Sequence, residues 1–281
     1  MAHRIMGGMQ RRLTGALTLI LLLVVASGAQ AQPLVGVLGI TREVAAVEQR
    51  LKDSREVVVR GFVFHVGTLN GRPVVVGRSG TGKVNAAVVT TVLISHFNPT
   101  ALFFSGTAGA IDQLLRPGDI VIGTAVAQHD TGRHAGGGFE RRGLRNTITG
   151  EIDPVLMPAP PALLAAARSA VTGLTLAPIT SAEGVHQPRI AEGVIVTGDV
   201  FVSDVMRRDE LRRSLDASAA EMEGGAMVQT CRQFGVPCLV VRSITDRADG
   251  TALNSYEQFL VKASENAAAV VAAIVAKLDP Q

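Results

Sequence analysis

The chain has 281 residues, 47% hydrophobic and 18% charged, which is enough apolar material for a large core. With no Trp, one Tyr and nine Phe, its composition argues against a nucleic-acid-binding module that works by base stacking. The net charge is +3, but the first 31 residues hold three arginines and no acid. Taking those three from 27 basic residues leaves 24, equal to the 24 acidic residues, so we expect no nucleic-acid or membrane partner held by charge.

Residues 1–31 are predicted to be a cleavable signal peptide. A basic start precedes the apolar run 16–26, and Ala29-Gln30-Ala31 is a small-x-small cleavage site. The alternative is an uncleaved anchor, but the run is shorter than the roughly 20 residues that span a bilayer. We therefore expect a periplasmic or secreted protein with no stable membrane association after cleavage, and a single domain over residues 32–281.

Residues 33–40 are predicted to form a buried strand, because they are rich in Val and Leu and end near a Gly. Thr41 is predicted to cap a helix over residues 43–51, whose apolar residues have helical spacing. Glu43 therefore lies where the strand gives way to the helix. The helix dipole alone could explain a carboxylate there, so a functional role is one of two interpretations.

Residues 56–69 and 72–78 are predicted to be two strands of a hairpin turning at Asn70-Gly71. The Gly-rich segment that follows resembles a nucleotide-triphosphate loop, but Val84 stands where Ser or Thr would hold magnesium. We therefore predict a turn that opens a helix and whose backbone N–H groups face an anion or a ligand hydroxyl.

The central part of the chain is predicted to alternate strands and helices. The expected elements are strands over 101–105, 120–128 and 193–202, and helices over 158–171 and 255–278. Small residues after the first of these strands, Gly106–Ala110, would let a flat ligand approach the backbone. The Gly- and Arg-rich segment 131–149 is predicted to be a mobile loop over the site or at a subunit contact. His129-Asp130 is interpreted as shaping the dimer-side rim, with catalysis as the alternative.

Residues 217–250 are predicted to hold the site. The segment is typical of a strand, an acidic turn, a helix, a strand and an acidic loop, with Glu221, Glu223, Asp246 and Asp249 at the element ends. Ligands of open α/β sheets bind at the carboxyl ends of strands. Glu221 is expected to pair with Arg242, because a cation would ease its repulsion with Glu223.

Cys231 and Cys238 are the two cysteines of the chain. An oxidising compartment would permit a bond between them, but their apolar surroundings favour two buried thiols. Neither their spacing nor their neighbours indicate a metal, and no cofactor is expected.

The motifs occur in an order that resembles the purine nucleoside phosphorylase superfamily, and within it the 5′-methylthioadenosine/S-adenosylhomocysteine nucleosidases. The resemblance covers about residues 34–278. It rests on Ser79-Gly80-x-Gly82-Lys83-Val84-Asn85-Ala86-Ala87, Gly106-Thr107-Ala108-Gly109, Gly118-Asp119-Ile120-Val121, Gly198-Asp199-x-Phe201, Glu221-Met222-Glu223-Gly224 and Val241-Arg242-Ser243-Ile244-Thr245-Asp246-x-Ala248-Asp249.

The resemblance implies a three-layer α/β/α sandwich with a mixed, mostly parallel central sheet. It also implies hydrolysis of the N-glycosidic bond of an adenine nucleoside, such as 5′-methylthioadenosine, S-adenosylhomocysteine or a related nucleoside. The products would be the free base and a ribose derivative. A small-molecule nucleoside is the expected partner, and a homodimer is the expected assembly.

The resemblance also implies roles for individual residues. Asp246 would protonate N7 of the purine, Glu43 would activate the attacking water, and Glu223 would bind the ribose hydroxyls. The remaining implied substrate-binding residues are Ser79, Thr107, Ala108, Gly109, Phe201, Val202, Glu221, Met222, Thr245 and Tyr256, and none is a metal ligand.

Two alternatives remain open from the sequence. A phosphate-dependent nucleoside phosphorylase would place Arg42 and Arg78 near an anion and would require phosphate for turnover. A nucleoside-binding or storage protein on the same fold would bind nucleosides with weak or no catalysis.

Overall fold

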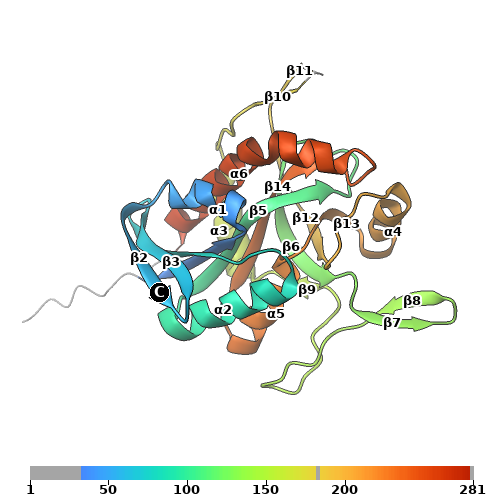
Figure 1. The fold of residues 1–281 in the computed structure, drawn as a ribbon, viewed down its shortest axis with the longest axis horizontal. Coiled ribbons are helices and arrows are strands. Elements are labelled where there is room, and N and C mark those ends of the chain that lie inside the picture. The colour runs from blue at the N-terminus through green and yellow to red at the C-terminus, as the bar shows by residue number, and fades with distance from the viewer. Residues whose placement is uncertain (1–32, 182–183, 279–281) are drawn as a thin grey trace, which may run out of the picture. The chain divides into compact units, whose positions relative to one another are not determined.

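The computed structural model describes residues 33–181 and 184–278 (Figure 1). The predicted signal peptide lies outside the described residues, so it stays a prediction. Gln32–Gln281 cluster as one compact unit. The central feature of the described residues is a ten-stranded sheet in the order β13-β12-β6-β14-β5-β1-β4-β3-β2, with β9 paired to β6.

The strands of the central sheet are β1 (Val35–Gly39), β2 (Lys52–Val59), β3 (Phe62–Leu69), β4 (Arg72–Arg78), β5 (Ala101–Ala110), β6 (Ile120–Gln128), β9 (Met157–Pro158), β12 (Ile190–Thr197), β13 (Ala217–Glu221) and β14 (Cys238–Asp246). The sheet is mixed, as predicted. β1, β4, β5 and β14 form a parallel run, and β12 is parallel to β6 and to β13. Antiparallel pairings join β14 to β6 and build the meander β2-β3-β4.

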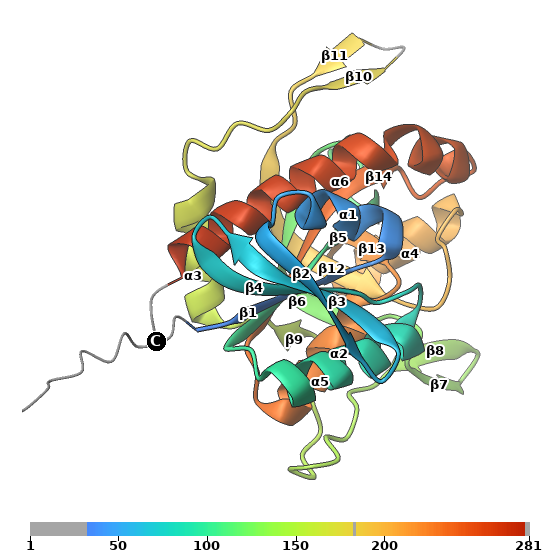
Figure 2. The same ribbon diagram turned by 60° about the vertical axis from the view of Figure 1, so that its left-hand side comes forward.

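Helices cover both faces of the sheet, as the α/β/α prediction requires. They are α1 (Thr41–Glu48), α2 (Lys83–Phe97), α3 (Pro161–Val171), α4 (Val205–Leu215), α5 (Gly224–Phe234) and α6 (Ala252–Lys277). α1 and α3 pack beside α6 on one face, whereas α2 and α5 pack together on the other (Figure 2). Two short hairpins, β7 (Gly132–Ala135) with β8 (Gly138–Arg141) and β10 (Ile179–Ser181) with β11 (Gly184–His186), project from the sheet (Figure 1).

The two layers of core follow from the alternation of side chains along the strands. On β5, Phe103 points to the α1/α3/α6 side, and its neighbours Leu102 and Phe104 point to the α2/α5 side. All three are fully buried, which is why this strand is apolar at successive positions rather than alternating with polar residues.

α6 is the core helix of its layer. Its buried residues recur at intervals of three and four, from Phe259 to Val275, and form the stripe that packs on the sheet. Within the described residues it is the helix long and apolar enough to cross a membrane, but most of its apolar stretch is buried in the fold. Its composition is therefore explained by packing.

Three local predictions meet different outcomes. The turn at Asn70-Gly71 is confirmed, with φ of +49° and +81° joining β3 to β4. The single strand predicted over 56–69 is wrong, because a turn at Arg60-Gly61 divides it into β2 and β3. Thr41 is the first residue of α1 and its side chain caps nothing, so the predicted cap is also wrong.

The prediction of a loop over residues 131–149 is wrong in part, because the hairpin β7–β8 occupies its first half. The side chain of Arg141 anchors the hairpin. It donates to the carbonyl oxygen of His129 at 3.1 Å and forms an ion pair with Glu210 on α4 at 2.8 Å.

Cys231 and Cys238 form a disulfide, so the interpretation as two buried thiols is wrong. The bond joins the last turn of α5 to the first residue of β14, with the two Cα atoms 6.3 Å apart. The chain reverses between them at Gly235, whose φ of +70° suits glycine. That sharp reversal brings the two sulfur atoms within bonding reach.

Candidate active site

Arg242 is the centre of a buried cluster of charges. Its guanidinium forms ion pairs with Glu221, with Glu223 at 3.3 Å and with Glu43 at 3.5 Å. It also stacks on the ring of Phe104 at 4.3 Å. The predicted pair between Glu221 and Arg242 is confirmed, but the cation holds two further carboxylates as well.

The cluster forms because three element ends meet. Glu43 lies in the first turn of α1 after β1, Glu221 ends β13, and Glu223 directly precedes α5. β5 lies between β1 and β14 and carries Gly106 opposite Arg242. A Cβ atom at position 106 would lie 2.3 Å from both the Arg242 Nη1 and the Glu43 Oε2 atoms, so glycine leaves the space that the charges occupy.

Two carboxyl groups of the cluster, those of Glu43 and Glu223, have raised pKa values. Burial raises the pKa of Glu43, although Arg242 and the Thr107 hydroxyl oppose the shift. Burial likewise raises the pKa of Glu223 to about 7, with Arg242 opposing and the charge of Glu221 adding to it. Near neutral pH Glu223 therefore exchanges its proton, which suits a group that must bind and release one.

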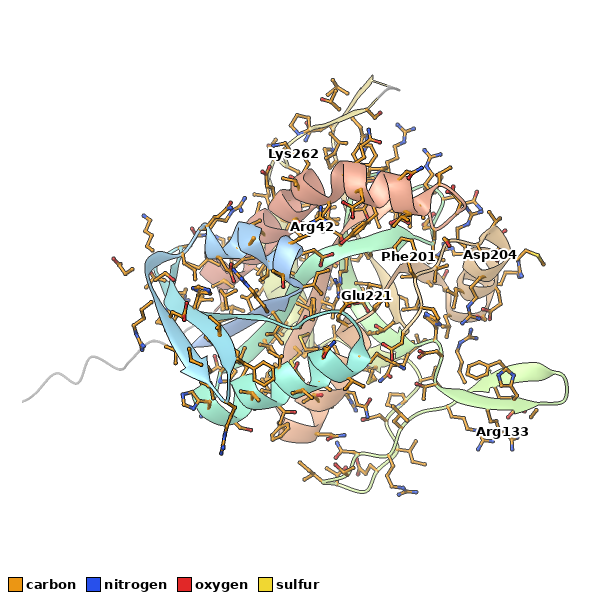
Figure 3. All side chains as sticks on the ribbon, viewed as in Figure 1. Arg42, Arg133, Phe201, Asp204, Glu221 and Lys262 are labelled. Carbon is orange, nitrogen blue, oxygen red and sulfur yellow. A yellow bond between two sulfur atoms is a disulfide. The ribbon has the colours of Figure 1, made fainter. Side chains whose placement is uncertain are left out.

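Glu221 and Glu223 differ in how many hydrogen bonds their carboxylates already accept. Glu221 accepts from the backbone N–H groups of Glu223 at 3.0 Å and Gly224 at 2.7 Å, and from the Thr197 hydroxyl. Glu221 is therefore an anchor, and it lies in the interior of the fold (Figure 3). Glu223 instead accepts one backbone hydrogen bond, at 2.9 Å, from Gly82 in the Gly-rich turn that was predicted to face an anion.

Asp246 lies four residues beyond Arg242, at the end of β14. Its carboxylate accepts hydrogen bonds from the Thr245 hydroxyl and the Ala248 N–H, both at 2.9 Å. Burial raises its pKa, although these two hydrogen bonds oppose the shift. Among the described residues no Lys or Arg forms an ion pair with it. The environment thus favours a carboxyl group that keeps its proton to higher pH than usual.

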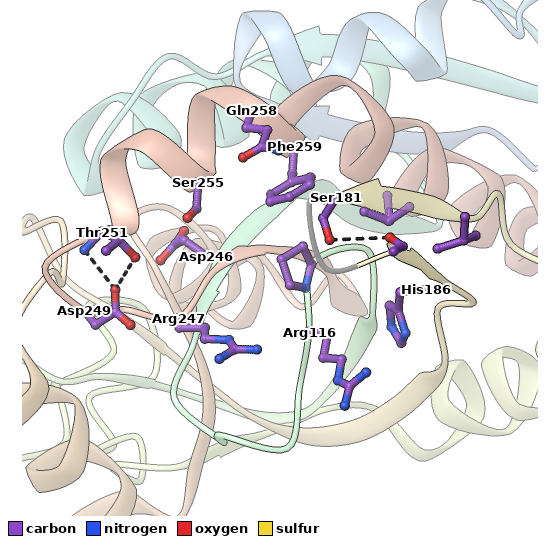
Figure 4. Close-up of a pocket in the computed structure, with 14 residues that line it drawn as sticks. Arg116, Ser181, His186, Asp246, Arg247, Asp249, Thr251, Ser255, Gln258 and Phe259 are labelled. Atoms are coloured by element: carbon purple, nitrogen blue, oxygen red, sulfur yellow. Dashed lines mark hydrogen bonds between the residues drawn. The ribbon is translucent and has the colours of Figure 1, made fainter.

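A cavity of about 320 Å³ adjoins Asp246 (Figure 4). Arg116, Arg247, His186 and the start of α6 also line it. Of the acidic residues predicted for the site, Asp246 and Asp249 belong to this lining, whereas Glu221 and Glu223 do not.

The small residues predicted for the site are on β5, between the cluster around Arg242 and the Asp246 carboxyl group. Ala108 accepts from the Thr245 hydroxyl through its carbonyl oxygen at 3.4 Å. A Cβ atom at Gly109 would lie 2.7 Å from the nearer carboxylate oxygen of Asp246, so this carboxyl group packs directly on the backbone. Thr107 faces Glu43 from the same strand. Ser79 is buried after β4, where its N–H donates to the Gly39 carbonyl oxygen at the end of β1.

Aromatic side chains flank the cluster. Phe201 is 45% exposed, so it does not fill the core, and its ring centroid is 6.3 Å from that of Tyr256. Burial and the nearby Glu43 raise the pKa of Tyr256 to about 12, so its hydroxyl keeps its proton. The other two predicted contacts differ in access, because Val202 is buried and Met222 is half-buried.

Two arginines of the phosphorylase alternative already have carboxylate partners. Arg42, labelled in Figure 3, lies on the first turn of α1. It makes a bidentate contact with Glu257 of α6 at 3.0 and 3.1 Å. Arg78 contacts Glu48 at 2.7 Å. In the described part of the chain, no group of three or more His, Cys, Asp or Glu side chains is arranged to hold a metal ion.

Sequence reasoning missed Arg242 as a member of the site and treated it as the partner of Glu221 alone. The available signal was a charged residue within an apolar strand flanked by Val241 and Ser243. A buried guanidinium requires partners, and the strand's neighbours supply them only in three dimensions.

The fold agrees with comparisons to known proteins. The family model described as the phosphorylase superfamily matches residues 33–276. The 5′-methylthioadenosine/S-adenosylhomocysteine nucleosidase of Psychromonas ingrahamii is 35% identical over 247 residues, which are 87% of this chain and 99% of the relative.

Two solved structures are similar to the fold. The Neisseria meningitidis nucleosidase of the same name, in complex with methylthio-immucillin-A, has a TM-score of 0.74 and 31% identity, covering 87% of this chain and 99% of its own. Futalosine hydrolase of Helicobacter pylori has a TM-score of 0.72 and 30% identity, covering 86% and 97%. The chain therefore belongs to the phosphorylase superfamily and, within it, to the family of 5′-methylthioadenosine/S-adenosylhomocysteine nucleosidases.

Proposed function

We propose that this protein hydrolyses the N-glycosidic bond of an adenine nucleoside to free base and a ribose derivative. The proposed substrates are 5′-methylthioadenosine, S-adenosylhomocysteine or a related nucleoside, on the strength of the relatives' names. The observation that carries the proposal is the buried set of carboxylates around Arg242, on the strand that ends in Asp246.

Asp246 is the proposed general acid. Adenine leaves poorly as an anion, and protonation at N7 lets it leave as a neutral base. A carboxyl group can supply that proton only if its pKa is raised, and burial raises the pKa of Asp246. Thr245 would orient the carboxyl group through its hydroxyl hydrogen bond.

Glu223 and Glu43 are proposed to act on the sugar and on water. As the bond breaks, the sugar becomes oxocarbenium-like, and a carboxylate bound to the ribose hydroxyls stabilises the growing positive charge. Glu43 would take a proton from the attacking water. Its Oε1 atom is held by the Thr107 hydroxyl, whereas its buried Oε2 atom has no hydrogen-bond donor among the described residues.

The remaining substrate contacts are proposals that follow the family resemblance. Phe201 would stack on the base, and Val202 would read it through its main chain. Met222 would pack under the sugar, and Tyr256 would line the 5′ side. Ser79 would hold the water or the sugar. The buried or half-buried positions of Ser79, Met222 and Tyr256 support these roles.

One assay separates hydrolysis from the two alternatives. The purified protein is incubated with methylthioadenosine, adenosine and inosine, with and without phosphate, and the sugar product is identified. We expect free base and a free ribose derivative at rates that do not depend on phosphate. Ribose 1-phosphate formed only with phosphate would favour the phosphorylase, and binding without release of base would favour a storage protein.

We propose that the protein is exported to the periplasm or secreted after cleavage of residues 1–31. The sequence pattern of the leader and the Cys231–Cys238 disulfide support this, because disulfides persist in oxidising compartments. Fractionation of cells expressing the full chain, with amino-terminal sequencing of the product, tests the proposal. Uncleaved protein in the cytoplasm would refute it.

We also propose a homodimer without stable membrane association. Large apolar side chains are exposed on the first turn of α2 and on the segment from β12 into α4, and such exposure is typical of contact surfaces. They are Val84, Val200, Val205 and Met206. Sedimentation of the mature protein at several concentrations tests the assembly, and a monomer throughout would refute it.

A further inference from the structure

Asp130, just beyond the end of β6, is a junction between two segments of the site. One of its carboxylate oxygens accepts from the Lys83 ammonium at 2.7 Å, and the other accepts from the backbone N–H of Asp199 at 2.9 Å. Burial disfavours the charged form of Asp130, but the bonds from Lys83 and Asp199 outweigh burial and hold its pKa below the ordinary value. Asp130 is therefore an ionised and fully engaged carboxylate.

The two segments that Asp130 joins also bind each other. The Asp199 side chain accepts from the backbone N–H of Lys83 at 2.8 Å, which satisfies the start of α2. The helix has no side-chain cap of its own, because Gly82 occupies the cap position with a φ of +91°. The cap is thus supplied by a residue 116 positions away, and Asp130 holds that residue in place.

The turn that this junction holds in place also hydrogen-bonds to Glu223. Gly82 belongs to the turn that Asp199 and Asp130 hold, and its N–H donates to Glu223 Oε1 at 2.9 Å. The other Glu223 oxygen faces Arg242 at 3.3 Å. The position of the Glu223 carboxylate therefore depends on Arg242 on one side and, through Gly82, on the Asp130 junction on the other.

His129 stabilises the turn of this junction that carries Asp199. It is fully buried, and its Nδ1 accepts from Arg207 at 2.9 Å. Burial and the neighbouring Arg207 lower its pKa to about 4, so the ring is neutral. Its ring packs on Gly198, where a Cβ atom would lie 2.4 Å away, and this fixes the turn that carries Asp199.

We propose that Asp130 is a positioning residue for catalysis, which acts through Lys83, Asp199 and Gly82 to orient the Glu223 carboxylate toward the ribose hydroxyls. The inference rests on the proposed role of Glu223 as the group that binds the sugar. Asp130 touches no reacting atom. Its loss releases the turn that carries the Gly82 donor and lets the Glu223 carboxylate move.

The test compares Asp130→Asn with Lys83→Met, which breaks the same junction from the other side. Glu192→Gln is the matched control, because it removes the charge of another ion pair, with Arg168 at 2.7 Å, at the opposite end of β12. We expect the first two variants to lose roughly 10-fold to 100-fold in kcat/KM on adenosine. The control is expected to match the wild type, and thermal unfolding confirms that each variant is folded.

The decisive readout is sugar discrimination, measured as kcat/KM on adenosine divided by kcat/KM on 2′-deoxyadenosine. If Asp130 acts through Glu223, its loss lowers this ratio toward that of Glu223→Gln. The double variant Asp130→Asn/Glu223→Gln should then be no worse than Glu223→Gln alone, because both changes remove one function. If Asp130→Asn does not fold, Lys83→Met gives the same comparison.

The outcomes separate the inference from the function on which it rests. A reduced ratio in Glu223→Gln that neither junction variant shares would overturn the inference and leave the role of Glu223 standing. Additive losses in the double variant would do the same. An unchanged ratio in Glu223→Gln itself would overturn the proposed role of Glu223, and the inference with it.

Discussion

The two ends of the site lie on one strand but treat their carboxyl groups differently. At Arg242, three glutamates surround a fully buried cation, whereas Asp246 is held by a hydroxyl and a backbone N–H, and no Lys or Arg of the described residues forms an ion pair with it. Burial raises the pKa of Glu43, Glu223 and Asp246, but only at the Arg242 end does a positive charge oppose the shift. Under the proposed mechanism, the difference separates carboxylates that act next to a positive charge from a carboxyl group that donates its proton.

Removing the cation tests the Arg242 end most directly. Arg242→Met should lower the free energy of unfolding by about 3–5 kcal/mol, because it leaves buried carboxylates without their partner. Urea unfolding measures the change. Arg42→Met, which breaks the exposed pair with Glu257, is the control and should change stability little. A loss for Arg242→Met as small as that of the control would show that the cluster does not depend on its cation.

Neutralising Asp246 should lower the rate of catalysis and leave the stability of the fold nearly unchanged. Asp246→Asn removes the proposed proton donor and should lower kcat by roughly 10²-fold to 10⁴-fold. The amide oxygen can still accept from the Ala248 N–H, and the amide NH2 can donate to the Thr245 hydroxyl, which keeps the Ala108 carbonyl oxygen as its own acceptor. The unfolding transition should therefore remain close to that of the wild type. Near-normal turnover in a folded Asp246→Asn protein would show that Asp246 is not the general acid.

The disulfide sharpens the comparison because it ties the Arg242 end of β14 to α5. Replacing Cys231 and Cys238 by Ala should lower the free energy of unfolding by about 2–3 kcal/mol, as expected for closing a short loop. The double variant should keep the kcat and KM of the wild type, since neither sulfur atom contacts the charged residues of the site. Denaturant unfolding with and without reductant measures the effect. Equal stability of the wild type and the double variant would contradict the prediction.

The pH dependence of stability tests the Glu223 carboxyl group by itself. The pKa of Glu223 is raised from an ordinary 4.5 to about 7, so the folded protein binds a proton that the unfolded chain releases. The resulting stabilisation is fully present below pH 4.5 and is lost as pH rises through 7. Relative to Glu223→Gln, the wild type should therefore lose on the order of 3 kcal/mol of unfolding free energy over this range. Parallel curves for the two proteins in pH-dependent unfolding would contradict the shift.

Local patterns were enough for elements with an unambiguous chemical signature. Asn70-Gly71 predicts its turn because both residues tolerate positive φ, and the apolar spacing of the last helix predicts its buried stripe. Arg60-Gly61 forms an equivalent turn that the sequence hides, because Arg rarely adopts a φ of +52° and carries no turn signal. The lack of a turn signal at Arg60-Gly61 is why β2 and β3 were predicted as a single strand over residues 56–69.

The sequence by itself determined the family and the acidic motifs, because these depend on residue types at short, recognisable spacings, and it predicted the pair between Glu221 and Arg242 from the repulsion of two neighbouring carboxylates. The tertiary structure decided that Arg242 also binds Glu43 and Glu223, that Gly82 donates to Glu223, and that the two cysteines bond. The contact of Gly82 with Glu223 joins residues 141 positions apart, and that of Glu43 with Arg242 joins α1 to β14. Their distances depend on strand order and on how sharply a loop reverses, and no local pattern encodes either.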